Sequence, residues 1–279
     1  HFRAGETPGA LARRLLRVNL SDLAAMGARP YAYMLNLVLP PGAGLTWLKG
    51  FAAGLARDQK TYGLTLAGGD TDVARGRLSI SATIFGLARG GRVLRRDAAR
   101  PGDDLYVSGT IGDAGLGRAC LAGRLNPGST DKRYLVNRFR LPEPRLALGQ
   151  GLVGLASAGL DVSDGLIADV RKLADAAKVK AVIESAKVPL SSAAQRIVTR
   201  NKRAPLKLLR AGEDYELVFT APVEARFRLE GLARRTGTAI TRIGRIVTER
   251  GVVVVGPLGK ELGIGHGGYE HFAKGGQAS

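Results

Sequence analysis

Apolar residues recur every three or four positions along the first stretch of the chain, which predicts an amphipathic helix. Thr7 followed by Pro8 is typical of a helix start, because Thr can cap free amide groups and Pro has no amide hydrogen to lose. Gly27 ends this pattern. Apolar and less apolar residues then alternate over 31–39 and predict a strand, and helical spacing returns over 45–62.

The alternation of strands and helices continues to the end of the chain. Strands are predicted at 64–67, 78–87, 105–108, 181–184, 216–220, 241–247 and 252–255, and helices at about 144–158, 166–177 and 223–235. The Gly-rich stretch after Gly256 predicts a surface loop. Because the two kinds of element alternate, the fold class is α/β or α+β, with its elements in layers.

The clearest change in composition along the chain is the turn sequence at 101–104. A chain of 279 residues is long enough for two domains of ordinary size. We therefore predict an N-terminal domain at 1–97 and a C-terminal domain at 98–279.

The chain is strongly basic, with 42 Lys and Arg against 24 Asp and Glu and a net charge of +18. A basic surface can bind nucleic acid through its phosphates, or it can attract small polyanions. The basic residues are scattered and aromatic residues make up 5% of the chain, which argues against a stacking platform for bases. Nucleic-acid binding remains the alternative from a different functional class.

Cys120 is the only cysteine, so neither a disulfide framework nor a multi-cysteine metal site can form within the chain. Its Ala and Leu neighbours predict a buried, inert thiol. No apolar run approaches the ~20 residues that span a bilayer, and no signal segment opens the chain. These features predict a cytoplasmic protein with no membrane partner. The chain begins with His1 rather than Met, which predicts a fragment or a processed chain.

Several common catalytic patterns are absent: the sequence has no P-loop, no pair of histidines at helical spacing and no G-x-S-x-G elbow. Acidic residues in Gly-, Ser- and Thr-rich contexts remain: Asp22, Asp70, Asp161, Asp164, Glu213 and Asp214. Mg²⁺ prefers oxygen ligands of this kind, supplemented by water and substrate phosphates. A shared metal site is therefore one interpretation of these acids.

Each acid also has a purely structural interpretation. Ser163 or Asp164 can cap the helix that follows, and Asp70 can stabilise a turn. Asp22 is hardest to explain structurally, because an Asp inside an apolar helix is unfavourable unless it is paired or exposed. The spacing alone leaves both interpretations open.

Taken together, these segments resemble thiamine-monophosphate kinases, which belong to a superfamily that includes aminoimidazole ribonucleotide synthetase. The likeness runs from His1 to Phe272 and keeps the order of the motifs. Its segments are Val18–Ala28 (VNLSDLAAMGA), Gly68–Thr71 (GGDT), Arg96–Asp103, Asp161–Gly165 (DVSDG), Gly212–Leu217 (GEDYEL), Ile243–Ile246 (IGRI) and Gly268–Phe272 (GYEHF).

The resemblance implies a two-domain fold like that of aminoimidazole ribonucleotide synthetase, a homodimer formed by the N-terminal domains, and transfer of a phosphoryl group from ATP to thiamine monophosphate. It implies Mg²⁺ ligands at Asp22, Asp70, Asp161 and Asp164. It implies ATP contacts at Tyr62, Gly69, Asp70, Arg96 and Ser163. It implies contacts with the thiamine phosphate at His1, Glu213 and Tyr269.

The family also carries an acidic segment before the position of His1, so the resemblance implies an incomplete N-terminal domain. Two further functions stay open beside the kinase: a related ATP-dependent synthetase of the same superfamily, and an inactive basic homologue that binds nucleic acid.

Overall fold

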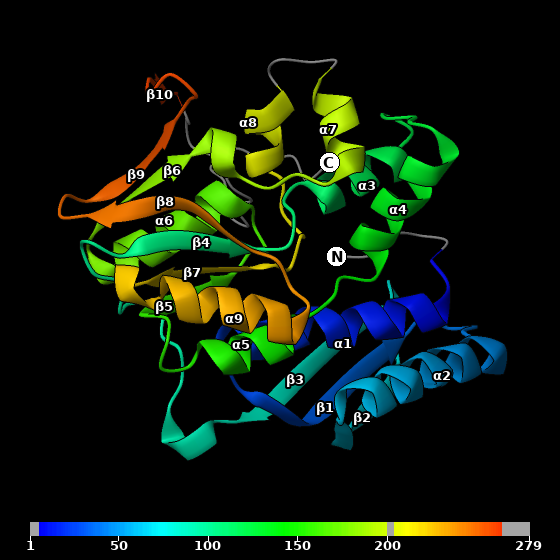
Figure 1. Cartoon of the computed structure of the whole chain (residues 1–279). Coiled ribbons are helices and arrows are strands. Elements are labelled where there is room, and N and C mark those ends of the chain that lie inside the picture. Colours follow the sequence, from blue (N-terminus) through cyan, green and yellow to red (C-terminus); the bar gives the residue numbers. More distant parts are fainter. Residues whose placement is uncertain (1–5, 200–203, 264–279) are drawn as a thin grey trace.

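Two β-sheets organise the chain, which is described here by a computed structural model covering residues 6–199 and 204–263 (Figure 1). The smaller sheet has the order β2-β1-β3 and contains β1 (Arg29–Leu39), β2 (Thr65–Val73) and β3 (Ser79–Leu87). The larger sheet has the order β10-β9-β6-β8-β4-β7-β5. The mixed α/β class predicted from the sequence is confirmed.

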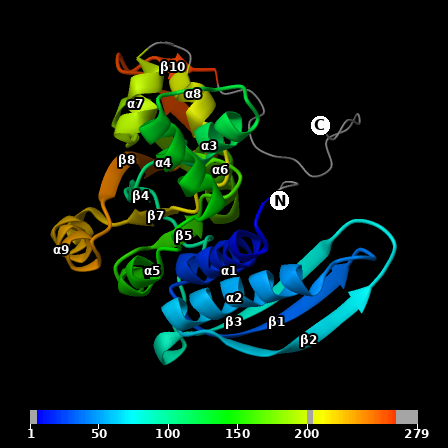
Figure 2. The same cartoon turned by 90° about the vertical axis from the view of Figure 1, so that its right-hand side faces the viewer.

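Helices α1 (Pro8–Ala25) and α2 (Leu45–Tyr62) lie on the same side of the smaller sheet (Figure 2). The predicted start of α1 is confirmed, because the Thr7 side chain accepts a hydrogen bond from the amide of Ala10. Leu16, Leu20 and Tyr33 are fully buried between the helices and the sheet.

The segment Gly68–Thr71 lies inside strand β2, so the expectation that the strand stops before it was wrong. Strand β2 pairs with β1 in parallel, and Asp70 lies opposite Asn36. Gly69 has φ 146°, and a Cβ there would lie 1.8 Å from the carbonyl oxygen of Leu35. Only glycine allows this close approach of the two strands.

The strands of the larger sheet are short. They are β4 (Asp104–Ser108), β5 (Ala158–Asp161), β6 (Lys180–Glu184), β7 (Leu217–Ala221), β8 (Ile240–Val247), β9 (Gly251–Val255) and β10 (Glu261–Leu262). β6 and β9 are parallel, whereas the pairs of β4 with β7 and with β8 are antiparallel. This mixed order leaves β5 at one edge, where it meets α1.

Helices cover both faces of the larger sheet. α6 (Leu166–Ala177) packs on one face, and α5 (Leu146–Leu152) and α9 (Arg226–Thr236, preceded by the 3₁₀ turn Val223–Ala225) pack on the other. A cluster of further helices lies beyond the sheet: α3 (Asp113–Leu121), α4 (Ser129–Arg140), α7 (Ser192–Val198) and α8 (Ala204–Leu209). In this cluster Cys120 is buried, as predicted.

Helix α1 belongs to both cores. Its earlier turns pack into the core of the smaller sheet, whereas Ala24 and Ala25 belong to the core that contains Leu148 and Phe219 of the larger half. The contact is close, since a Cβ on Gly149 would lie 1.9 Å from the carbonyl oxygen of Ala24. Helix α1 therefore places its C-terminal turns directly against β5 and α5.

Two sequence predictions need correction. The helix expected at about 144–158 is only Leu146–Leu152, and strand β5 begins at Ala158. Helices α4, α7 and α8 were not predicted, and the expected loop after Gly256 contains the short strand β10. In the part of the chain that the structure describes, no helix is both long and apolar enough to cross a membrane.

Candidate functional site

The C-terminal turns of α1 face the end of strand β5, and two acidic residues meet there. Asp161 is the last residue of β5 and is only 4% exposed. The hydroxyl of Ser21, which is buried, donates a hydrogen bond of 2.9 Å to the Asp161 carboxylate. Asp22, the next residue of α1, remains exposed on the same side.

Burial, together with the negative charge of Asp22, raises the pKa of Asp161 to about 7, against the opposing effect of the Ser21 hydrogen bond. Desolvation by the surrounding protein also raises the pKa of Asp22. In the described part of the chain neither carboxylate forms an ion pair with a basic side chain, and burial disfavours the ionised form of both. The pair can therefore take up a proton or a cation.

Both carboxylates line a cavity of about 530 Å³ that also includes Arg96. The segment that carries Arg96 is fixed to both halves of the molecule. The amide of Leu94 donates to the carbonyl of Met26, and the amide of Gly159 donates to the carbonyl of Arg95, at 3.0 and 3.1 Å. Predicted metal and ATP residues thus come together in this cavity, called here the carboxylate cavity.

Asp164 lies in the loop after β5, but its side chain binds Lys172 and does not line the carboxylate cavity. Its carboxylate accepts a hydrogen bond of 2.5 Å from Lys172, which also binds the carboxylate of Asp169. The expectation that Ser163 or Asp164 caps α6 was wrong: the N-cap residue is Gly165, and it makes no side-chain cap. Instead, Asp169 accepts a hydrogen bond from the backbone amide of Asp164.

Glu213 forms an ion pair with Arg14 of α1. Arg14 was not among the predicted site residues. Arg14 is 4% exposed, and its guanidinium lies 4.4 Å from the centre of the Phe139 ring. In the part of the chain that the structure describes, its second terminal nitrogen is buried without a hydrogen-bond partner. A signal was available in the sequence, because residues 14, 18, 21 and 22 share one face of a helix.

The loop that carries Glu213 has unusual backbone geometry. Glu213 and Tyr215 have φ angles of 76° and 51°, which non-glycine residues seldom adopt. Backbone hydrogen bonds hold them there, since the amide of Glu213 donates to Ser163 and that of Tyr215 donates to Val162. The two loops that follow β5 and precede β7 are therefore fixed to each other.

The other two acids of the GEDYE sequence are structural. Asp214 is 1% exposed and accepts hydrogen bonds from the amides of Gly112 (2.7 Å) and Ala114 (3.1 Å) at the start of α3. Glu216 is fully buried and accepts hydrogen bonds from Arg138 (2.7 Å) and Arg145 (2.6 Å). These acids hold helices and loops in place around the larger sheet.

The raised pKa of Asp214 should be visible in how the free energy of unfolding changes with pH. Burial raises its pKa to about 7, although the amide hydrogen bonds oppose this shift, whereas an unfolded Asp titrates near ~3.9. Between these values the folded chain keeps a proton that the unfolded chain has lost. The free energy of unfolding should therefore fall as pH rises, by at most ~1.4 kcal/mol per pH unit.

Asp214→Asn should flatten this slope, which urea unfolding at several pH values between about 4 and 8 would measure. Asp175→Asn, at an exposed position of α6, is the matched control and should leave the slope unchanged. Equal slopes for wild type and Asp214→Asn would contradict the assignment.

Other predicted residues are not brought into the carboxylate cavity. Asp70 is exposed on β2, where its carboxylate accepts a hydrogen bond from the amide of Thr71, and neither it nor Gly69 lines the cavity. Tyr62 packs at the end of α2, with the Arg17 guanidinium 5.5 Å from its ring centre. His1 and Tyr269 lie outside the described residues.

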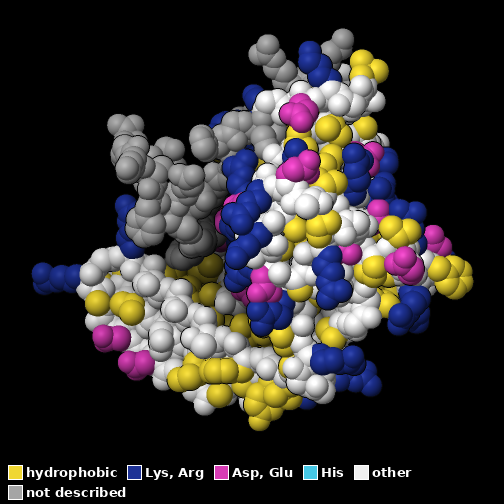
Figure 3. All heavy atoms as spheres, turned by 90° about the vertical axis from the view of Figure 1, so that its left-hand side faces the viewer, with side chains coloured by type: hydrophobic (Ala, Val, Ile, Leu, Met, Phe, Trp, Pro, Cys, Tyr) yellow, Lys and Arg dark blue, Asp and Glu magenta, His cyan; other side chains and the backbone are white. Residues whose placement is uncertain are grey.

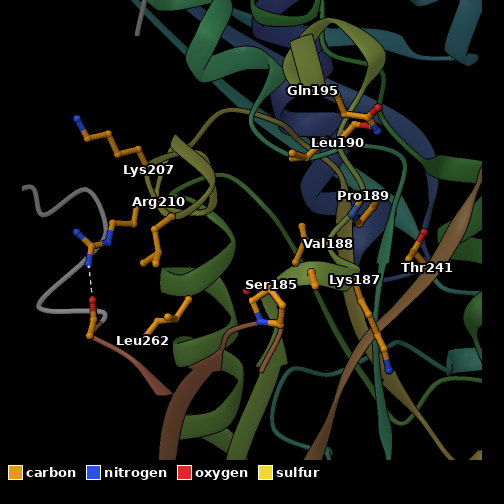
Figure 4. A pocket seen from close by; sticks show the side chains of 14 residues that line it. Ser185, Lys187, Val188, Pro189, Leu190, Gln195, Lys207, Arg210, Thr241 and Leu262 are labelled. Carbon is orange, nitrogen blue, oxygen red and sulfur yellow. Dashed lines mark hydrogen bonds between the residues drawn. The ribbon is translucent and has the colours of Figure 1, made fainter. Parts of the chain in front are cut away.

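A larger cavity of about 1020 Å³ lies elsewhere, between α8, β10 and the turn after β6 (Figure 4). Its lining includes the apolar residues Val188, Leu206 and Leu262 and the basic residues Lys207 and Arg210. None of the predicted site residues lines it. We therefore assign the candidate site to the smaller carboxylate cavity, where charged groups converge.

No group of three or more His, Cys, Asp or Glu side chains in the described ranges 6–199 and 204–263 has the arrangement of a complete metal site. A Mg²⁺ ion, however, commonly takes one or two protein carboxylates and completes its shell with water and substrate phosphates. The Asp22 and Asp161 pair, with its unneutralised charge beside an open cavity, fits such an ion.

Comparison with known families gives matches over most of the chain. Residues 1–88 match the family of AIR synthase related proteins, N-terminal domain, and residues 100–256 match the C-terminal domain of the same proteins. The chain is 40% identical to thiamine-monophosphate kinase from Escherichia coli over 274 residues, which cover 98% of this chain and 83% of that protein. Identity to thiamine-monophosphate kinase from Pyrococcus abyssi is 34% over 272 residues, which cover 96% of this chain and 81% of that protein.

Solved structures agree. Thiamine-monophosphate kinase from Stenotrophomonas maltophilia superposes with a TM-score of 0.84 and 41% identity, covering 91% of this chain and 81% of that one. AaThiL in complex with AMPPCP and TMP superposes with a TM-score of 0.84 and 30% identity, covering 98% of this chain and 83% of that one.

Proposed function

Because the chain belongs to the thiamine-monophosphate kinase family, we propose that it transfers the γ-phosphoryl group of ATP to thiamine monophosphate and forms thiamine diphosphate. The likeness to a structure that holds AMPPCP and TMP supports an ATP-dependent reaction on this substrate. The observation in the structure that carries the proposal is the carboxylate cavity, where Asp22, Asp161 and Arg96 converge.

We propose that Asp22 and Asp161 hold Mg²⁺. When bound, the ion would neutralise negative charge on the phosphates of ATP. Asp161 contributes a carboxylate fixed by Ser21, so little side-chain motion remains to be restricted on binding. Asp70 and Asp164 stay predicted ligands, and Asp164 would have to leave Lys172 to serve as one.

Arg96 lines the same cavity, and its guanidinium would bind phosphate oxygens. Ser163, Gly69 and Tyr62 remain predicted ATP contacts, and His1, Glu213 and Tyr269 remain predicted contacts of the acceptor. The attacking atom is already a phosphate oxygen, so no strong general base is required. The work left to the protein is to align two anions and offset their repulsion.

We also propose a homodimer built on the smaller sheet. Helices cover one of its faces, while Tyr31, Met34 and Phe85 stay exposed and every residue of β2 is exposed. Apolar groups gathered on an uncovered sheet are typical of an interface. Light scattering that gives the mass of a single chain at micromolar concentration would contradict this. We further propose a domain division at residue 97, Mg²⁺ as the metal and a cytoplasmic location.

A direct product assay tests the function. The full chain would be incubated with ATP, Mg²⁺ and thiamine monophosphate, and thiamine diphosphate would be detected by chromatography. We expect product, and we expect its loss on chelation with EDTA. A folded chain that binds ATP but forms no thiamine diphosphate would refute the proposed acceptor.

The face drawn in Figure 3 gives little support to nucleic-acid binding as a second function. Its Lys and Arg side chains form one short column interrupted by acidic side chains, and smaller groups separated by apolar and neutral surface. Binding to the nucleic-acid backbone favours a continuous basic track instead.

A further inference from the structure

A separate cavity of about 480 Å³ lies beside the residues that follow α1, and it collects positive charge. Its lining includes Arg29, Arg89 and Arg92, together with Gln150 of α5, and we call it the arginine pocket. It shares no lining residue with the carboxylate cavity. None of its lining residues is acidic.

The backbone brings these three arginines together from two places in the sequence. Arg89 begins a 3₁₀ turn, and the amide of Arg92 donates to the carbonyl of Arg89 at 3.3 Å. Arg89 and Arg92, at the two ends of this turn, both line the pocket. Arg29 pairs with Leu87 across β1 and β3, only two residues before Arg89.

Glycines make this arrangement possible. Gly90 and Gly91 have φ angles of 60° and 70°, a conformation that glycine adopts without steric cost. The wall of the pocket is tightly packed, since a Cβ on Gly27 would lie only 2.3 Å from Val153. The arginine pocket is therefore built on a fixed backbone.

The charges in this pocket lack the partners that other arginines have. Arg95 pairs with Asp97, and Arg145 pairs with Glu143 and Glu216. By contrast, no ion pair or hydrogen bond joins the side chains of Arg29, Arg89 or Arg92 to any residue in the described part of the chain. Their mutual repulsion is relieved when an anion binds between them.

We propose that the arginine pocket binds a small anion that carries a diphosphate group. Guanidinium groups match phosphate oxygens in pairs, and three of them balance the charge of a diphosphate near neutral pH. The volume of about 480 Å³ lies within the roughly 300–1,000 Å³ of small-molecule sites.

Titration calorimetry of the full chain with pyrophosphate, in buffer with EDTA and no Mg²⁺, tests this proposal. Arg29→Gln/Arg89→Gln should raise the Kd about tenfold or more, because each charge-assisted hydrogen bond to phosphate contributes to affinity. Arg75→Gln/Arg250→Gln removes the same charge at exposed positions outside the pocket and should leave the Kd within about twofold. All four arginines are exposed, so the variants should fold.

Arg96→Gln separates this pocket from the proposed active site, and it should leave pyrophosphate binding intact. Loss of binding in that variant, an equal loss in both double variants, or no binding by wild type would each overturn the proposal. So would binding of a DNA duplex that depends on Arg29 and Arg89 while pyrophosphate does not bind. In the Arg96→Gln background, ADP binding more tightly than pyrophosphate would identify a nucleotide as the ligand, and equal affinities would identify free diphosphate.

Discussion

Replacing Asp161 by Asn should abolish turnover while the protein stays folded. The substitution removes one of two carboxylates proposed to hold Mg²⁺, and metal ions supply several kcal/mol of charge stabilisation in phosphoryl transfer. We expect kcat to fall about a thousandfold or more, which corresponds to ~4 kcal/mol. Steady-state assay of thiamine diphosphate formation measures this change.

Stability should respond differently from activity. The pKa of Asp161 is raised to about 7, so at about pH 8 the folded chain carries an ionised carboxylate that its surroundings disfavour. A neutral Asn removes this cost, and the melting temperature at that pH should not fall. Asp175→Asn, on the exposed side of α6, is the control and should leave both quantities unchanged. A kcat for Asp161→Asn within about threefold of wild type would refute the role of the pair.

Glu216→Gln should be the most destabilising of these substitutions. The Glu216 side chain is 0% exposed, and it binds Arg138 and Arg145, whose side chains are 12% and 13% exposed. Burial lowers the pKa of both guanidiniums, but Glu216 together with neighbouring acids outweighs this effect and leaves both raised. Without the carboxylate two buried cations repel each other, and breaking buried pairs costs about 3–5 kcal/mol.

Glu143→Gln provides a matched control, because it removes another partner of the same Arg145. Glu143 lies 3.2 Å from Arg145, but its side chain is 65% exposed. Exposed ion pairs contribute only ~0–1 kcal/mol. Urea unfolding followed by circular dichroism would compare the variants, and losses of similar size would show that Glu216 has no special role.

The sequence predicts most of the secondary structure where the periodicity is long and has clear ends. Helix α1 has Thr7 and Pro8 at its start, and α2 ends at Gly63 in a left-handed conformation. Prediction failed where tertiary packing determines where a helix ends and a strand begins. The apolar residues after Pro144 suggested one long helix, but the chain leaves α5 at Leu152 and enters strand β5 at Ala158.

The site was predictable only in part, for a physical reason. Asp22 stood out because an acid on an otherwise apolar helix needs an explanation, and the structure places it beside Asp161. Residue type and spacing alone do not distinguish Glu213, which faces α1, from Glu216, which neutralises two buried arginines. The difference depends on positive φ angles at Glu213 and Tyr215, which local residue preferences do not predict.

The double role of helix α1 restricts which changes in length this chain can accept. Along one helix, Leu16 and Leu20 pack into the smaller core, Arg14 reaches Glu213, and Ser21 reaches Asp161. Each residue of an α-helix turns the chain by about 100°, so one inserted or deleted residue rotates everything beyond it away from its partner. An insertion or deletion just before Ser21 would leave the first turns packed, but it would turn Ser21 and Asp22 away from Asp161. Evolution can therefore exchange side chains along α1, but it cannot lengthen or shorten the helix without rebuilding both cores at once.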